Sequence, residues 1–88
     1  MKHRERTTHA KRAVREALAE AGFPERIDAR KLVVSEGPEA EVSYYEVYVP
    51  GEAPCDARFI AKAIVQADGT TDVEVFPENF HLLQESER

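Results

Sequence analysis

The sequence predicts an α+β domain in which an N-terminal amphipathic helix packs on a four-stranded antiparallel meander sheet, followed by a short C-terminal helical turn. Three observations predict this class. Apolar residues recur at helical spacing near the start of the chain, β-branched and aromatic residues alternate with polar ones further on, and glycine or proline turn signals separate these segments. Because the connections are short, consecutive strands are expected to pair antiparallel, with the helix on one face of the sheet.

The helix is predicted over residues 8–21, where the small and apolar residues fall at i, i+3, i+4 and i+7 spacing. Thr7 or Thr8 can cap its start, and Gly22 can end it in a left-handed conformation. Residues 1–7 are predicted to form a flexible basic lead-in. The residues of the apolar stripe are Ala10, Ala13, Val14, Ala17, Leu18 and Ala21.

The first two strands are predicted over residues 31–36 and 41–49, with Gly37-Pro38 as the turn signal that ends the first. The second strand is rich in β-branched and aromatic residues. Since side chains alternate between the two faces of a sheet, two sets are expected on opposite faces. One set is Val42, Tyr44, Glu46 and Tyr48, and the other is Ser43, Tyr45, Val47 and Val49.

The segment 57–67 fits either a strand or a helix. As a strand it directs Phe59, Ala61, Ala63 and Val65 inward, with Ile60 and Ile64 on the outer face. As a helix capped by Asp56 it presents a stripe of Phe59, Ile60, Ala63, Ile64 and Ala67. The strand is favoured because Asp68-Gly69 and the alternating residues 71–76 follow it, which is typical of a hairpin. The helix stays open as the alternative.

The end of the chain completes a single small domain over residues 1–88. Phe80, Leu82 and Leu83 predict a short closing turn, and residues 84–88 a polar tail. The expected arrangement of one helix on an antiparallel sheet is cystatin-like, which is an analogy of fold and does not fix function.

Composition favours a folded domain over a disordered one, with 42% hydrophobic and 33% charged residues. No apolar run is long enough to cross a bilayer, and no secretory leader is visible. Cys55 is the only cysteine, so no internal disulfide can form. We therefore expect a cytoplasmic protein without a membrane contact.

Charge is distributed unevenly along the chain. Residues 1–31 carry nine Lys/Arg against five Asp/Glu, whereas residues 32–88 carry three against twelve. A basic segment of this kind can neutralise phosphates, so nucleic-acid binding by the helix is one hypothesis. In it the contacting residues are Lys2, Arg4, Arg6, Lys11, Arg12 and Arg15. The helix followed by EGPEAEVSYYEVYV resembles the start of a double-stranded RNA-binding domain, but the later lysine-rich helix start of such domains is missing.

Three tyrosines on one predicted strand indicate a contact surface, because tyrosine adds large area with few rotatable bonds. Tyr44 and Tyr48 are expected on one face and Tyr45 on the other. The favoured function is therefore a non-enzymatic protein-binding module, of an adaptor, inhibitor or immunity type. It would bind a protein partner or itself, as a homodimer, through the sheet, with the acidic surface selecting a basic partner.

No catalytic, metal or cofactor motif is apparent. His3, His9 and His81 lack the spacing of a metal site, and the acidic residues are numerous enough to form close pairs by chance. The acidic neighbour Asp56 disfavours a reactive Cys55 thiolate. A small enzyme or a ligand pocket between helix and sheet remains a third hypothesis.

Overall fold

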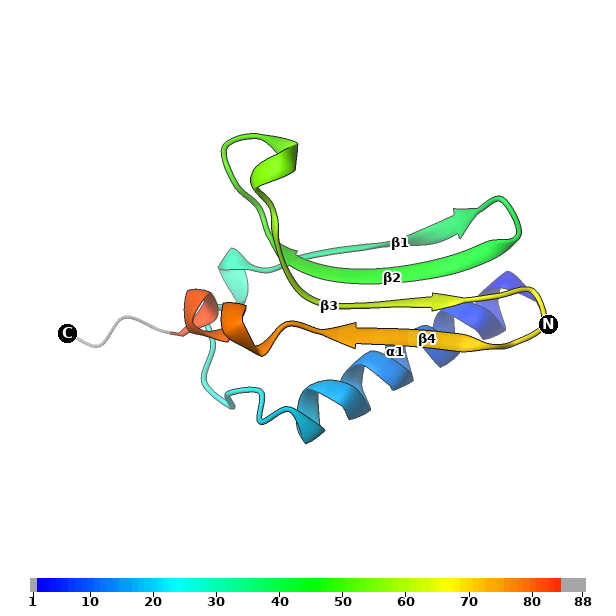
Figure 1. Ribbon diagram of the computed structural model, residues 1–88, viewed down its shortest axis with the longest axis horizontal. Helices are drawn as coiled ribbons and strands as arrows, with labels where there is room; N and C mark the ends of the chain where they lie inside the picture. Colours follow the sequence, from blue (N-terminus) through cyan, green and yellow to red (C-terminus); the bar gives the residue numbers. More distant parts are fainter. Residues whose placement is uncertain (1, 85–88) are drawn as a thin grey trace.

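One helix packs on one face of a four-stranded antiparallel sheet in the computed structural model, which describes residues 2–84 (Figure 1). The strands lie in the order β1-β2-β3-β4, so the predicted α+β class and the meander are confirmed. The elements are α1 (His3–Glu20), β1 (Val33–Glu39), β2 (Val42–Val49), β3 (Arg58–Val65) and β4 (Thr71–Val75), with the 3₁₀ segments η1 (Ala29–Lys31), η2 (Pro54–Asp56) and η3 (Pro77–Leu83).

Helix α1 begins earlier than the sequence predicts. Its first turns are anchored to the sheet, because Arg6 Nε donates a hydrogen bond to Ser43 Oγ over 3.0 Å and His3 Nδ1 lies 2.8 Å from the same oxygen. Thr7 and Thr8 do not cap the helix, since their hydroxyls donate to carbonyl oxygens four residues earlier. The predicted start near residue 8 was therefore wrong, and most of the segment expected as a lead-in is helical.

The end of α1 confirms the prediction from the sequence. Gly22 has a φ of 78°, which is the left-handed region. Its N–H donates to Ala19 O over 3.3 Å, and the Phe23 N–H donates to Leu18 O over 3.0 Å. These two bonds satisfy carbonyl groups that the end of a helix otherwise leaves without partners.

Strand β1 continues through the dipeptide that was expected to end it. Gly37 and Pro38 both lie within the strand, and the turn follows at Ala40 and Glu41, with Ala40 at a φ of 55°. The predicted turn was wrong because β1 is an edge strand, where a proline is tolerated.

Strand β3 confirms the strand interpretation of residues 57–67. The alternation of its side chains between the two faces shifts by one residue within the strand. Val47 pairs with Ala61 and Tyr48 pairs with Phe59, so Ile60 is an extra residue, a β-bulge. The bulge buries Ile60 completely and moves Phe59 to the other face of the sheet. The expected orientations of these two residues were therefore wrong.

The sheet has an inner face toward α1 and an open face away from it. Ser43, Tyr45 and Val47 of β2 belong to the inner face, and Tyr44, Glu46 and Tyr48 to the open face, as the alternation predicts. The core lies between α1, the inner face and η3. Its buried apolar residues are Ala10, Val14, Val47, Ile60, Ala61, Ala63, Val65, Phe80 and Leu83.

Helix α1 does not cover the whole inner face. It packs mainly on β2, β3 and β4, so the inner side of β1 stays uncovered and Val34 is 48% exposed. The predicted C-terminal turn is η3, whose Phe80 ring meets the Phe23 ring edge-to-face at 5.1 Å between centroids. Residues 85–88 of the predicted tail lie outside the described residues.

None of the helices within residues 2–84 combines the length and the apolar character that a membrane crossing requires.

Candidate functional site

The three tyrosines do not form one surface. Tyr44 and Tyr48 lie on the open face, whereas Tyr45 lies on the inner face, where the Lys11 ammonium sits 5.9 Å from its ring centroid. All three are partly exposed. The predicted contact residues therefore belong to two different sites on opposite sides of the sheet.

An aromatic row crosses the open face. The ring centroids of Tyr48 and Phe59 are 5.9 Å apart, and those of Phe59 and Phe76 are 6.1 Å apart. The Lys62 ammonium lies 5.4 Å from the Phe59 centroid and 5.7 Å from that of Phe76. The row lies outside the core because the bulge at Ile60 turns Phe59 outward.

The β2–β3 loop bounds a hollow of about 410 Å³ on this face. Tyr48 and Phe59 contribute aromatic surface, while Glu46 and Glu52 contribute carboxylates. A Cβ at Gly51 would overlap Asp56, so glycine is required for the tight loop. The hollow therefore combines aromatic rings and negative charge. Its remaining lining residues are Pro50, Gly51, Ala53 and Ala57.

Negative charge continues across the open face. Glu46 pairs in register with Lys62, which pairs with Glu74 on the next strand. Asp72 adds a further carboxylate opposite Ile64. Within residues 2–84, none of these carboxylates forms a salt bridge, so they are available to a cationic partner.

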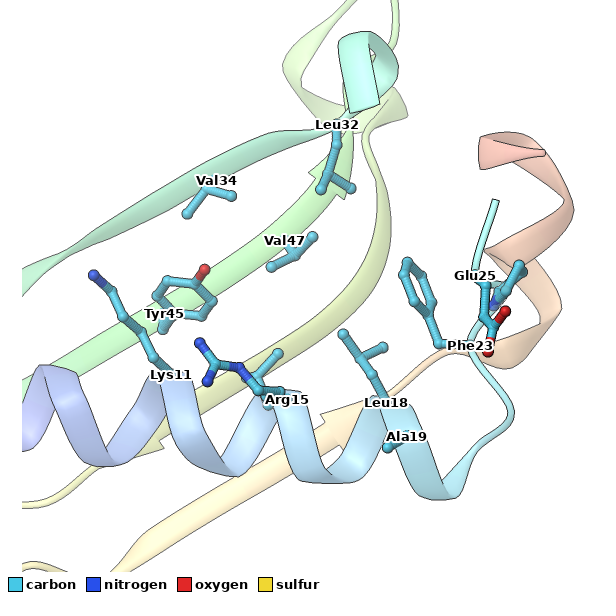
Figure 2. A pocket seen from close by; sticks show the side chains of 12 residues that line it. Lys11, Arg15, Leu18, Ala19, Phe23, Glu25, Leu32, Val34, Tyr45 and Val47 are labelled. Carbon is cyan, nitrogen blue, oxygen red and sulfur yellow. The ribbon is translucent and has the colours of Figure 1, made fainter. Parts of the chain in front are cut away.

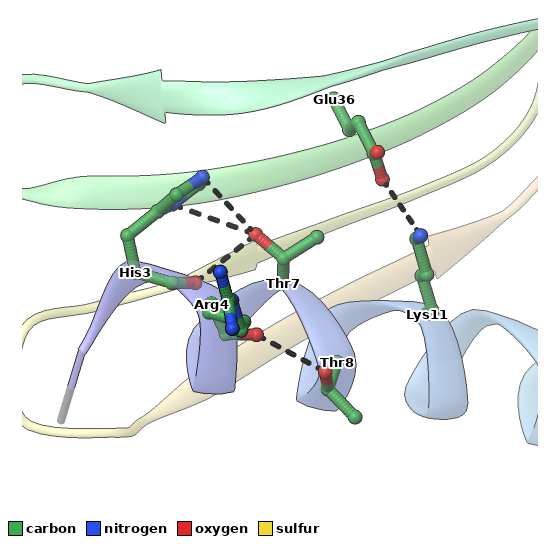
Figure 3. A network of polar contacts seen from close by, with 6 residues as sticks. All are labelled: His3, Arg4, Thr7, Thr8, Lys11 and Glu36. Carbon is green, nitrogen blue, oxygen red and sulfur yellow. Dashed lines mark hydrogen bonds and ion pairs between the residues drawn. The ribbon is translucent and has the colours of Figure 1, made fainter.

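The structure divides the six predicted basic residues into two groups. Arg6 is half-buried against Ser43. Lys11 Nζ lies 3.2 Å from Glu36 Oε2 (Figure 3). The other group is exposed on or next to α1. It consists of Lys2, Arg4, Arg12 and Arg15.

A groove lies between α1 and the β1–β2 side of the sheet, in the region where the third hypothesis expects a ligand pocket, but sequence reasoning assigned no residues to it (Figure 2). Its volume is about 470 Å³. Lys11 and Arg15 extend over it from α1, and Tyr45 lies opposite them on β2. No local pattern signals this groove, because it exists only where α1 leaves β1 uncovered. Its apolar walls come from Val14, Leu18, Ala19, Phe23, Pro24, Leu32, Val34 and Val47.

The titratable groups with shifted pKa values lie outside these sites. The Arg30 side chain lowers the pKa of Asp28, and the backbone N–H of Thr70 lowers the pKa of Asp68. Both carboxylates shape local turns. Among residues 2–84, no group of three or more histidine, cysteine or acidic side chains is placed to hold a metal ion.

Comparison with protein-family models, with curated proteins and with solved structures finds no match.

Proposed function

We propose that this protein is a small non-enzymatic protein-binding module whose contact surface is the open face of the sheet. The observation that carries the proposal is the aromatic row of Tyr48, Phe59 and Phe76, which lies partly exposed on the face opposite the core. Aromatic residues are enriched at protein interfaces because they add large, rigid contact area.

The partner is a basic protein segment. Glu46 and Glu52 border the hollow beside Tyr48 and Phe59, and an arginine or lysine side chain matches both the carboxylates and the ring faces. Lys62 of the chain itself already occupies such a position over Phe59 and Phe76. Tyr44 and Ile64, which is 38% exposed, extend the same surface.

The cytoplasm is the compartment we propose for this module, since a lone exposed Cys55 suits a reducing environment.

Site-specific photocrosslinking tests the contact surface. A photoreactive phenylalanine analogue replaces Tyr48 in one variant and the exposed His9 of α1 in the control, and crosslinked species are identified by mass spectrometry. We expect crosslinking to a discrete partner, or to a second copy of this chain, from position 48 and not from position 9. Equal crosslinking at both positions, or none at position 48, would contradict the proposal.

Nucleic-acid binding by α1 is the second candidate. It is supported by the exposure of Lys2, Arg4, Arg12 and Arg15. Neutralising about four phosphates predicts a log-log slope of affinity against salt of about -3 to -4. Fluorescence anisotropy of mixed-sequence DNA and RNA oligomers measures that slope. Salt-sensitive binding by the unaltered protein that is lost in an Arg4→Glu, Arg12→Glu double variant would move this candidate to first place. If the unaltered protein did not bind even at low salt, nucleic-acid binding would be excluded.

A further inference from the structure

The groove between α1 and β1 is largely apolar, and its few charged groups lie at different places along its length. Lys11 and Arg15 extend over one part of it from α1, and the carboxylate among its lining residues belongs to Glu25, in the segment that follows the helix (Figure 2). Leu18, Val34 and Val47 provide apolar surface between them. A ligand in the groove is therefore expected to have an anionic end and an apolar body.

Arg15 is available to such an anion. Within residues 2–84 it forms no salt bridge or hydrogen bond, and its side chain is exposed. Lys11 already holds a carboxylate, since its Nζ lies 3.2 Å from Glu36 Oε2. This contact shows that the ammonium group is positioned to accept a carboxylate at the edge of the groove. Glu36 consequently competes with any ligand carboxylate for Lys11.

The position of Glu25 determines which end of a ligand lies toward the C-terminal end of α1. A carboxylate near Glu25 would meet a like charge, while a carboxylate between Lys11 and Arg15 would meet two opposite charges, of which that of Lys11 is shared with Glu36. The anionic end therefore lies over the middle of α1, and the apolar body extends toward Phe23. From Lys11 to Ala19 the helix rises about 12 Å, which sets the length of the whole ligand, anionic end included.

We propose that this groove binds a small amphipathic carboxylate, an alkyl chain with one anionic end. The volume of about 470 Å³ lies within the range of roughly 300–1,000 Å³ that is usual for small-molecule sites. A peptide strand added to the edge of the sheet would contact alternate residues along β1. Leu32 and Val34 are such alternate residues, but Pro38 interrupts the free edge of β1, which disfavours an added strand and favours a small molecule over a peptide.

Titration with decanoate, followed by the backbone amide signals of the labelled protein, tests the proposal. Decanoate is expected to shift the signals of Leu18, Phe23 and Val34 in a saturable way. Decyltrimethylammonium, which has an alkyl chain of similar length and the opposite charge, is the matched ligand control and is expected to bind more weakly. Binding of the cation as tightly as decanoate would overturn the proposal, as would the absence of saturable shifts in the groove.

Three variants of exposed residues locate the anionic end. Arg15→Gln is expected to weaken decanoate binding about two- to fivefold, the range for an exposed ion pair. Glu36→Gln is expected to strengthen it, because Lys11 is released. Arg12→Gln is the matched control, since Arg12 is exposed on the same helix and does not border the groove. An equal loss in Arg12→Gln and Arg15→Gln would overturn the assignment.

A peptide is the competing occupant. An acetylated tetrapeptide of valine and leucine with a free C-terminal carboxylate carries the same charge on a different body. Tighter binding of this peptide than of decanoate would overturn the small-molecule assignment. Photocrosslinking at position 48 is independent of these results, because the groove and Tyr48 lie on opposite faces of the sheet.

Discussion

Arg6 donates a hydrogen bond from Nε to the hydroxyl of Ser43, over 3.0 Å, and Ser43 has no exposed surface. His3 Nδ1 lies 2.8 Å from the same hydroxyl oxygen. A single buried oxygen of β2 therefore joins the first two turns of α1 to the sheet. This contact explains why the helix begins before the segment that its own apolar pattern predicts.

Replacement of Ser43 by alanine is expected to lower the free energy of unfolding by about 1–3 kcal/mol, because polar partners at this position lose their hydrogen-bonding group. Urea denaturation measures the change. Ser35→Ala is the matched control, since Ser35 is half-buried on the open face of β1. An equal, small effect in both variants would show that Ser43 does not anchor the helix.

The bulge in β3 gives a second pair of matched variants. Ile60→Ala is expected to lower the free energy of unfolding by about 2–5 kcal/mol, because it leaves a cavity in the core. Ile64→Ala removes the same atoms from a side chain that is 38% exposed, and we expect a loss of at most about 1 kcal/mol. Equal losses of stability in the two variants would contradict the burial of Ile60 by the bulge.

Alanine substitutions at Gly22 and Gly37 distinguish the effect of backbone strain from the effect of steric crowding. Gly22 has a φ of 78° with open space around it, so Gly22→Ala is expected to lower the free energy of unfolding by about 1–2 kcal/mol through backbone strain alone. Gly37 lies in β1 without a positive φ, and an added Cβ would meet Tyr44 at ordinary contact distance. Gly37→Ala is therefore expected to raise this free energy by about 0.4–1 kcal/mol in urea unfolding, because alanine has fewer conformations in the unfolded chain.

Protonation of Asp68 at low pH is expected to lower the free energy of unfolding. Its carboxylate accepts the N–H of Thr70 over 2.9 Å, which lowers the pKa of Asp68 in the folded protein. A lowered folded-state pKa contributes stability that is present above the ordinary pKa and is lost as the pH falls through the folded value. Asp68→Asn is expected to remove this contribution.

The carboxyl-carbon chemical shift of Asp68, followed against pH, measures this pKa directly. The transition in the folded protein is expected at lower pH than the transition of Asp68 in the urea-unfolded chain. Coincident transitions would contradict the hairpin geometry around Thr70.

Local patterns predicted the helix and a sheet of four strands in the observed order, although a helix stayed open as the alternative over residues 57–67. The cap at Gly22 and the hairpin at Asp68-Gly69 depend on residues next to one another in the chain, so the sequence predicts them correctly. The errors arise where distant residues decide the structure. The early start of α1 depends on Ser43, which lies on β2 and carries no helical signal.

The sites were less predictable than the fold. Alternation correctly separates Tyr44 and Tyr48 from Tyr45, but the bulge that brings Phe59 beside Tyr48 has no signature in the sequence. The groove under Arg15 depends on how far α1 reaches across the sheet, which is a property of packing and not of any one segment.

The continuation of β1 through Gly37 and Pro38 has a consequence for aggregation. A free strand edge can template the addition of further strands from other copies, and a proline within it interrupts that ladder. The opposite edge, β4, is only five residues long and carries Asp72 and Glu74. Both edges therefore resist sheet extension, which favours the faces of the sheet over its edges as places where another molecule can attach.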